Sequence, residues 1–477
     1  MRILVRLAQA TAGLLVGLAL AEGAFWWRDD GAFPHVAVYV PDAALGARLQ
    51  PHARQRIAFG GNPTTTFTTN DRGYRGADWP PPSPDTVLVV GDSQVFGLGV
   101  EDDQTLAARL AERLGRPVLN GGVPTYGPDE YLDVVGEIAA ERPLRTVVLV
   151  LNFGNDLFEI GRPNRERHAI WDGWAVRAET APASTTWFPG RAWLYGRSHA
   201  FFALRKLLHT PRPEEDAGFA SEGTVQDVVR TSADRAGAHA RADERVGRER
   251  DAAADAYEAA LGTLGDTTTL VAVYDEVMDA VGSDEALYLR AAVEGASVGD
   301  IVGVRYAESS RRVTVTAEIL EEGARIRRDL RQRMRRLAAE TDETWLRDLL
   351  VRTLAKTESS LDPALARETL AVAPLPTPFD GVLDRFAALA ATHGFEPVVV
   401  ALPLDVMVLP SQLAKYGEAP ADLSGTHVLL DELAEAARAR RMRVAAPLPA
   451  LREAGDPAFL KADLHLSALG QDTVAAV

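Results

Sequence analysis

A repeated alternation of buried strands and amphipathic helices is the feature that most constrains the fold of this chain. Apolar runs rich in β-branched residues predict strands at residues 86–90, 117–120, 146–151, 397–402 and 442–446. Helical periodicity follows at residues 103–114, 128–142, 378–393 and 427–440, and from 467 onward. Continuous apolar strands are typical of parallel sheets buried on both faces. We therefore expect an α/β fold, a three-layer α/β/α sandwich with a parallel five-stranded sheet and a site at the carboxyl ends of its strands.

Residues 161–377 interrupt this alternation with a connection far longer than is usual in a compact domain. Residues 161–210 are aromatic-rich and are expected to pack against the sandwich. Residues 211–252 are charged and poor in bulky apolar side chains, which predicts a solvated or disordered linker. From 253 to about 371 the pattern predicts a mainly α-helical insertion of antiparallel segments. The sandwich domain is therefore split into two parts, residues 85–160 and 378–477.

A predicted helix of this insertion carries a run of arginines between Arg325 and Arg336. Such a basic face can hold an anionic partner, either an anionic polymer or a lipid headgroup surface. The alternative is a solvated face near the many acidic residues of the chain, which is the more common role of such a run.

The first thirty residues predict export. Arg2 and Arg6 precede residues 7–27, which are mostly apolar, long enough to span a bilayer, and end in a pair of tryptophans suited to a membrane interface. A shorter apolar core at 12–21 ends in Ala-Leu-Ala, which has the form of a cleavable signal peptide. A third interpretation is a buried helix of a cytosolic domain.

Both export signals place the rest of the chain outside the cytoplasm. An uncleaved anchor over residues 1–30 gives a single-pass envelope protein, and a cleaved signal gives a periplasmic or secreted one. We favour the anchor because it gives the tryptophans a role. Residues 31–84 follow as a lead-in of short extended segments and turns.

Composition narrows the possible chemistry. The 477 residues contain no cysteine, which excludes disulfides, a cysteine nucleophile, zinc knuckles and iron–sulfur clusters. The 51 basic and 67 acidic side chains give a net charge of −16, which argues against general binding to nucleic acid. The histidines other than His465 have no ligand spacing, so we expect no metal site.

Polar residues follow the predicted strands at one edge of the sheet. Ser93 comes directly after the first strand in a Gly-Asp-Ser tripeptide, and Asn155 and Asp156 follow the third strand. Asp463 and His465 lie in the last predicted loop. A serine becomes a nucleophile when a histidine takes its proton and a carboxylate orients that histidine. Ser93, His465 and Asp463 fit these roles, although such a tripeptide alone is more often a capped turn.

Four groups of segments around these residues resemble the blocks of the SGNH hydrolase, or GDSL esterase/lipase, family. They are residues 70–76 with 87–100, 120–128, 152–157 and 463–470. The blocks occur in the family's order, and the likeness covers roughly residues 31–160 and 378–477. The chain is most similar to a membrane-anchored bacterial type with a large helical insertion. This resemblance implies a flavodoxin-like sandwich that hydrolyses or transfers acyl esters without a cofactor.

The resemblance also implies roles for individual residues. Ser93 would be the nucleophile, His465 the general base and then acid, and Asp463 the residue that orients His465. The oxyanion hole would be formed by the backbone N–H groups of Ser93 and Thr125 and the side-chain amide of Asn155. Three further residues would support these loops: Asp92, Gly122 and Asp156.

Three features depart from the family pattern. Thr125 and Phe153 stand where the family usually has glycine. One residue, rather than the commoner two, separates Asp463 from His465, a spacing that resembles the branch acting on exopolysaccharide O-acetyl groups. This spacing favours an ester on carbohydrate, although simple esterases share it.

The function that we expect is an exported serine ester hydrolase that cleaves acyl esters, acetyl esters in particular, on a small molecule or on acylated carbohydrate. One alternative is an O-acetyltransferase that acts on envelope polysaccharide with the same residues. A different class of alternative is a non-catalytic envelope scaffold that binds a partner through the helical insertion, and the departures at Thr125 and Phe153 would favour it.

Overall fold

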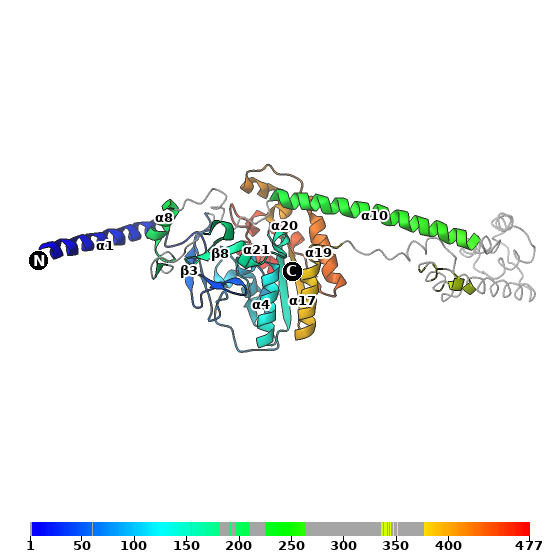
Figure 1. The fold of residues 1–477 in the computed structure, drawn as a ribbon, viewed down its shortest axis with the longest axis horizontal. Helices are drawn as coiled ribbons and strands as arrows, with labels where there is room; N and C mark the ends of the chain where they lie inside the picture. The colour runs from blue at the N-terminus through cyan, green and yellow to red at the C-terminus, as the bar shows by residue number, and fades with distance from the viewer. Residues whose placement is uncertain are drawn as a thin grey trace, which may run out of the picture. The chain divides into compact units, whose positions relative to one another are not determined.

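The computed structural model describes most of the chain outside the centre of the predicted insertion. The described residues are 2–59, 61–153, 155–181, 190–191, 194, 196–208, 225–262 and 376–477, with a few positions between 335 and 351. The chain divides into two compact units (Figure 1). Unit 1 comprises Met1–Ala236 and Pro376–Val477, and unit 2 comprises Gly237–Leu375.

In the described part of the chain, a parallel five-stranded sheet lies at the centre of unit 1. Its strands are β5 (Val87–Val90), β6 (Val118–Asn120), β7 (Thr146–Asn152), β10 (Glu396–Leu402) and β11 (Arg443–Ala445). Their order is β11-β10-β7-β5-β6, and every neighbouring pair is parallel. Each strand lies within one residue of its predicted position. The predicted α/β fold with a parallel five-stranded sheet is therefore confirmed.

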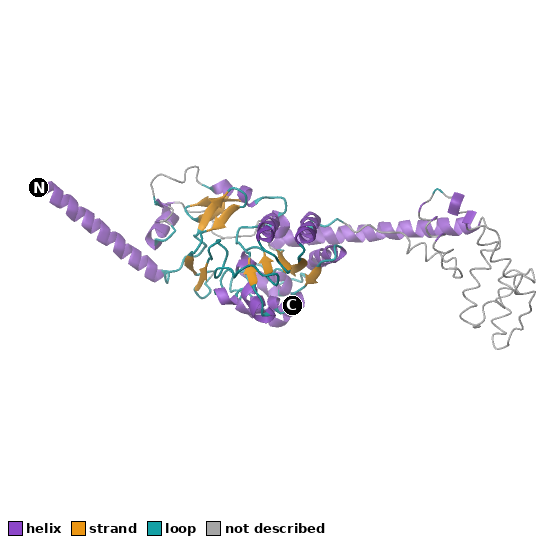
Figure 2. Ribbon diagram, turned by 90° about the horizontal axis from the view of Figure 1, so that it is seen from below, coloured by secondary structure: helices purple, strands orange, loops and turns teal. Residues whose placement is uncertain are grey.

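Helices cover both faces of this sheet, as Figures 1 and 2 show. On one face, Leu88 and Val90 belong to a core with α4 (Pro128–Glu141), α17 (Asp380–His393) and α19 (Val428–Ala439). On the other face, Val87 and Val89 pack with α3 (Leu106–Leu114), α20 (Leu448–Ala454) and α21 (Ala468–Ala475). Successive residues of β5 thus enter different cores, which explains why its apolar run is continuous.

The lead-in segment forms short antiparallel hairpins. β1 (Tyr39–Asp42) pairs with β2 (Gly46–Leu49), and β3 (Arg54–Ile57) pairs with β4 (Thr65–Thr68). A further hairpin, β8 (His168–Trp171) with β9 (Trp174–Arg177), contacts β1 and β2. The described part of the aromatic-rich segment therefore packs against the lead-in. It also packs against the sandwich, as we predicted, because Asn164 N–H donates to Glu130 of α4 at 2.8 Å and Arg167 donates to the Thr125 carbonyl at 3.1 Å.

Arg75, at the end of the lead-in, is buried against the first turn after β5. Its guanidinium donates to the carbonyl oxygens of Phe96 (2.9 Å) and Val100 (2.6 Å). It also forms an ion pair with Asp102, with Nε 2.8 Å from Oδ1. Arg75 therefore holds the lead-in against the short helix α2 (Ser93–Phe96), which carries Ser93.

The N-terminal helix α1 (Arg2–Arg28) is the candidate membrane anchor. Among the described residues, its segment Gln9–Arg28 is the helical stretch long and apolar enough to cross a membrane. The side chains of residues 9–20 are exposed. The length and composition of this helix therefore agree with the predicted membrane anchor.

Within the predicted solvated or disordered linker over residues 211–252, residues 225–252 are not disordered, because Val225–Gly262 form the helix α10, whose described side chains are mostly exposed or partly exposed. The segment is rich in alanine and carries oppositely charged side chains one helical turn apart, such as Arg248 and Glu244 (2.9 Å), which favour a helix. Val228 and Ser232 in its first turns are buried. Residues 211–224 and most of the predicted helical insertion lie outside the described residues. Of the arginine run at 325–336, only Arg335 and Arg336 are described, and both are exposed.

Replacing Arg75 with methionine is expected to lower the free energy of unfolding of unit 1 by about 3 kcal/mol, because buried carbonyls and Asp102 lose their partner. The melting temperature of the full chain measures this effect. The matched variant Arg109→Met removes a surface pair with Glu112 and should change stability by less than about 1 kcal/mol. Equal melting temperatures of the two variants would contradict the role of Arg75.

Candidate active site

Ser93 is the first residue of α2 and follows a tight turn of two residues, Gly91 and Asp92, after β5. The side chain of Asp92 caps this helix by accepting a hydrogen bond from the backbone N–H of Gln94 at 2.8 Å. A Cβ on Gly91 would lie 2.5 Å from the Val95 side chain, and a Cβ on Gly122 would lie 2.4 Å from a backbone nitrogen of α2. Only glycine fits at both positions, so Gly122 supports the site by letting the second block approach α2.

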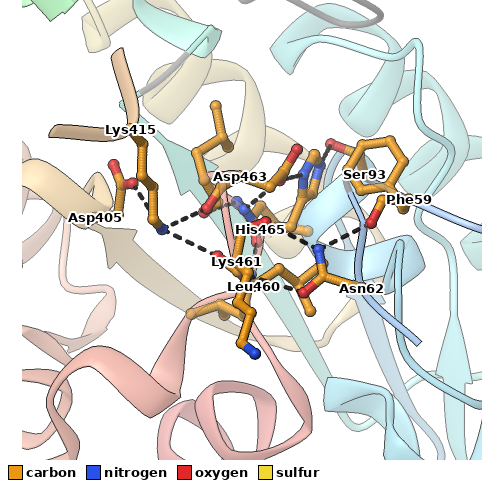
Figure 3. Close-up of polar contacts among 12 residues, drawn as sticks. Phe59, Asn62, Ser93, Asp405, Lys415, Leu460, Lys461, Asp463 and His465 are labelled. Atoms are coloured by element: carbon orange, nitrogen blue, oxygen red, sulfur yellow. Dashed lines mark hydrogen bonds and ion pairs between the residues drawn. The ribbon is translucent and has the colours of Figure 1, made fainter. Parts of the chain in front are cut away.

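The structure brings Ser93, His465 and Asp463 together (Figure 3). Ser93 Oγ lies 2.7 Å from His465 Nε2. His465 Nδ1 is hydrogen-bonded to Asp463 Oδ1, and the backbone N–H of His465 donates to the same oxygen at 2.8 Å. A carboxylate on Nδ1 favours the tautomer that is protonated there, which leaves Nε2 free to accept the serine proton.

The charges around the imidazole favour its protonated form. Burial by itself lowers the pKa of His465, but the adjacent Asp463, with contributions from Asp92 and Asp405, outweighs burial and raises it. Burial raises the pKa of Asp463, but the charge and hydrogen bonds of His465 outweigh this and lower it. The pair is therefore suited to stabilise an imidazolium next to Ser93.

Gln94, the neighbour of Ser93, holds the loop that carries His465. Its Oε1 accepts a hydrogen bond from the backbone N–H of Leu466 at 3.0 Å, and its Nε2 donates to the carbonyl of Leu464 at 3.2 Å. The residues on both sides of His465 are thereby fixed to the helix that carries the serine.

Lys415, at the end of the 3-10 helix Pro410–Tyr416, supports the same loop from the other side (Figure 3). Its Nζ donates to the carbonyl oxygens of Asp463 (2.7 Å) and Leu460 (3.0 Å). Asp405, which is fully buried just after β10, lies 3.4 Å from Nζ and accepts a hydrogen bond from Tyr416. Lys415 thus joins the β10 edge of the sheet to the Asp463 loop.

Part of the lead-in covers the site (Figure 3). The Phe59 ring meets the His465 ring edge-on, with centroids 5.3 Å apart. Asn62 exchanges two hydrogen bonds of 2.9 Å with the backbone of Lys461. As a result, Ser93 is only 7% exposed and His465 only 3% exposed.

Asn155 lies beside this centre but its amide is already engaged. It precedes the helix α5 (Asp156–Glu159), and its Nδ2 donates to Glu159 Oε2 at 3.1 Å. Its Oδ1 accepts from Asn152 Nδ2, which also donates to Asp92 Oδ2, each at 3.0 Å. The network links Asn155 to the residue next to Ser93, and its role as an oxyanion donor stays a prediction.

The second block, residues 120–128, contacts the same network through Arg167. The Thr125 carbonyl accepts a hydrogen bond from Arg167 at 3.1 Å, and Arg167 forms an ion pair of 2.7 Å with Glu159. The Gly122 N–H donates to Asn120 Oδ1 at 2.9 Å, so it is used within the block. The backbone N–H of Thr125 stays a predicted donor.

Asp156 is fully buried and supports the loop at the end of β7. It accepts hydrogen bonds of 2.7 Å from the Tyr131 hydroxyl and from the Asn152 N–H. Burial raises its pKa well above the usual range, and the charges of Asp92 and Glu159 add to this. Burial likewise raises the pKa of Asp92, although its hydrogen bonds oppose the shift.

Several site residues were missed at the level of sequence. Asn152 is the last residue of β7 and Gln94 directly follows Ser93, so their closeness to predicted site residues could have indicated them. Lys415, Phe59 and Arg167 come from segments with no motif and meet the site only through the tertiary fold.

A scan of protein-family models gives no match to this chain, and a search of curated proteins gives none either. In the part of the chain that the structure describes, no group of three or more His, Asp or Glu side chains is placed to bind a metal ion.

The raised pKa of His465 can be measured directly. In full-length protein with labelled histidines, one imidazole resonance, absent in His465→Gln, should titrate above the ordinary value of about 6.5. Asp463→Asn should lower its midpoint, because the neutral amide no longer stabilises the imidazolium. A midpoint that does not move in Asp463→Asn would rule out this coupling.

Proposed function

We propose that the chain is a serine ester hydrolase of the SGNH type, held outside the cytoplasm by α1. The observation that carries this proposal is the 2.7 Å contact between Ser93 Oγ and His465 Nε2, with Asp463 on the opposite ring nitrogen. These groups meet at the carboxyl edge of a parallel sheet, where α/β proteins place their sites. The four sequence blocks support family membership and a flavodoxin-like arrangement.

In the proposed reaction, His465 Nε2 takes the Ser93 proton as Oγ attacks the ester carbonyl. The imidazolium, stabilised by Asp463, then protonates the departing alcohol and leaves an acyl group on Ser93. Water repeats the sequence, giving up its proton to Nε2 as it attacks, and the acid and free serine are released. The base form of His465 exists above its raised pKa, so kcat/KM should fall as the pH drops through that value.

The tetrahedral intermediate carries a negative oxygen that needs donors. The backbone N–H groups of Ser93 and Thr125 and the amide of Asn155 are the donors in this proposal. The Asn155 amide nitrogen donates to Glu159 Oε2 at 3.1 Å, and an amide nitrogen has a second N–H with which to contact the oxyanion.

The substrate that we favour is an acetyl ester, carried on carbohydrate. Its support is the spacing of one residue between Asp463 and His465, which resembles the branch of the family that acts on such esters.

Full-length protein in detergent should hydrolyse a small activated acetyl ester, and Ser93→Ala should lower kcat by about 10⁴-fold or more. The matched variant Ser424→Ala, at an exposed serine, should retain the activity of the parent. A fluorophosphonate probe should label the parent and not Ser93→Ala. If the parent shows no hydrolysis and is not labelled, the result would favour the non-catalytic scaffold instead.

The low exposure of Ser93 and His465 favours a second candidate, an O-acetyltransferase on envelope polysaccharide, because a covered acyl-enzyme is shielded from water. With an oligosaccharide acceptor present, this candidate predicts acetylated sugar by mass spectrometry and a matching drop in free acetate. Free acetate alone, at every acceptor concentration, would favour the hydrolase.

A further inference from the structure

The outer part of α1 carries an acidic side chain, Glu22, inside the candidate membrane span. Its carboxylate accepts hydrogen bonds from the Ser198 hydroxyl (2.5 Å) and from the backbone N–H groups of His199 (2.9 Å) and Ala200 (3.0 Å). These donors form the start of α8 (His199–Leu208), where N–H groups lack helical partners and the helix dipole favours an anion. Glu22 therefore fixes α8 against α1 (Figure 1).

Further contacts tie this pair of helices to the rest of unit 1. Asp29 Oδ2 lies 3.2 Å from His199 Nδ1, and the Phe33 ring stacks on the His199 ring with centroids 4.3 Å apart. Phe202 of α8 packs with Phe33 and Trp174 in a small buried cluster. The end of α1 is thus a packed part of the unit.

The position of Glu22 limits how far the hydrocarbon of a bilayer can extend along α1. A carboxylate at the centre of a membrane helix is costly, by roughly 3 kcal/mol on insertion scales. The polar start of α8 lies at the same level as Glu22. The outer boundary of the hydrocarbon must therefore fall before Glu22, near residue 21.

This boundary leaves a short apolar span. Residues 7–21 of α1 cover only about 22 Å at the helical rise, less than the roughly 30 Å of a typical hydrocarbon core. A short span draws the flanking structure toward the membrane. The flanking structure here is α8, whose Leu204 is 44% exposed, and the last turn of α1, whose Trp27 is 82% exposed.

We propose that α8 lies in the outer interface of the bilayer beside α1, with Leu204 and Trp27 in contact with lipid and with Glu22 holding the two helices together. The partner is the lipid bilayer, because exposed Trp27 belongs to α1 itself and exposed Leu204 lies on the helix that Glu22 holds against α1. The inference rests on α1 spanning the membrane and does not depend on the ester chemistry.

The absence of cysteine makes the contact testable by site-specific labelling. Leu204→Cys and the matched Leu114→Cys, a leucine of α3 with 46% exposure, each receive a fluorophore in the full-length chain. The proteins are reconstituted in vesicles of phosphatidylethanolamine and phosphatidylglycerol that carry a nitroxide quencher on the lipid. Quenching at position 204 should be at least twofold stronger than at position 114, and equal quenching overturns the proposal.

The role of Glu22 is tested with spin labels on Trp27→Cys and Leu204→Cys in one chain. The distance distribution should be narrow in the parent and should broaden in Glu22→Leu, since leucine cannot accept the hydrogen bonds of α8. The control Asp30→Asn, which loses a surface pair with Arg56, should leave it narrow. An unchanged distribution in Glu22→Leu overturns the role of Glu22.

Alkaline carbonate extraction of membranes tests whether α1 spans the bilayer. The full chain should stay with the membrane, and its release would overturn both the anchor and the interfacial α8. Hydrolysis of an acetyl ester by the same preparation is measured separately, so failure of the membrane proposal and failure of the enzymatic one are distinguishable.

Discussion

The hydrogen bond between Ser93 and His465 joins residues 372 positions apart, and the arrangement of the sandwich centres on it. One half of the chain presents the serine at the start of α2, where close packing requires glycine at position 91 of the preceding turn and at position 122 of the neighbouring loop. The other half presents the histidine from an irregular loop. Such a loop keeps its shape when its polar backbone groups have partners, and Gln94 and Lys415 supply them. The geometry of the proposed nucleophile therefore depends on contacts that cross between the halves.

The lead-in segment connects this centre to α1, the candidate membrane anchor. Phe33, five residues after the end of α1, pairs with Ile57 of β3. Two residues further on, Phe59 lies against His465. A continuous series of packed residues thus runs from the anchor to the proposed base, and the same segment that covers the site is built onto the end of α1.

Buried carboxylates surround the predicted oxyanion region. The residues that pair with them had no evident role in the sequence, and this pairing gives them one. Asn152 donates to Asp92 and to the Asn155 oxygen, while Arg167 neutralises Glu159. An unpaired charge here would be strongly destabilising, so the network requires all of its members. It also orients the Asn155 side chain, whose oxygen accepts from Asn152 and whose nitrogen donates to Glu159.

The sequence by itself determined the α/β alternation and the position of every strand of the sheet, because burial on both faces requires continuous apolar runs such as 87–90. It also singled out Ser93, which follows a strand, and Asp463 and His465 in the last predicted loop, because these residue types together supply a nucleophile, a base and an orienting carboxylate. Only the tertiary structure decided the contacts of Lys415 with the Asp463 loop and of Glu22 with α8. Those contacts join segments that share no periodicity, and hydrogen bonds to backbone groups leave no pattern in side-chain composition.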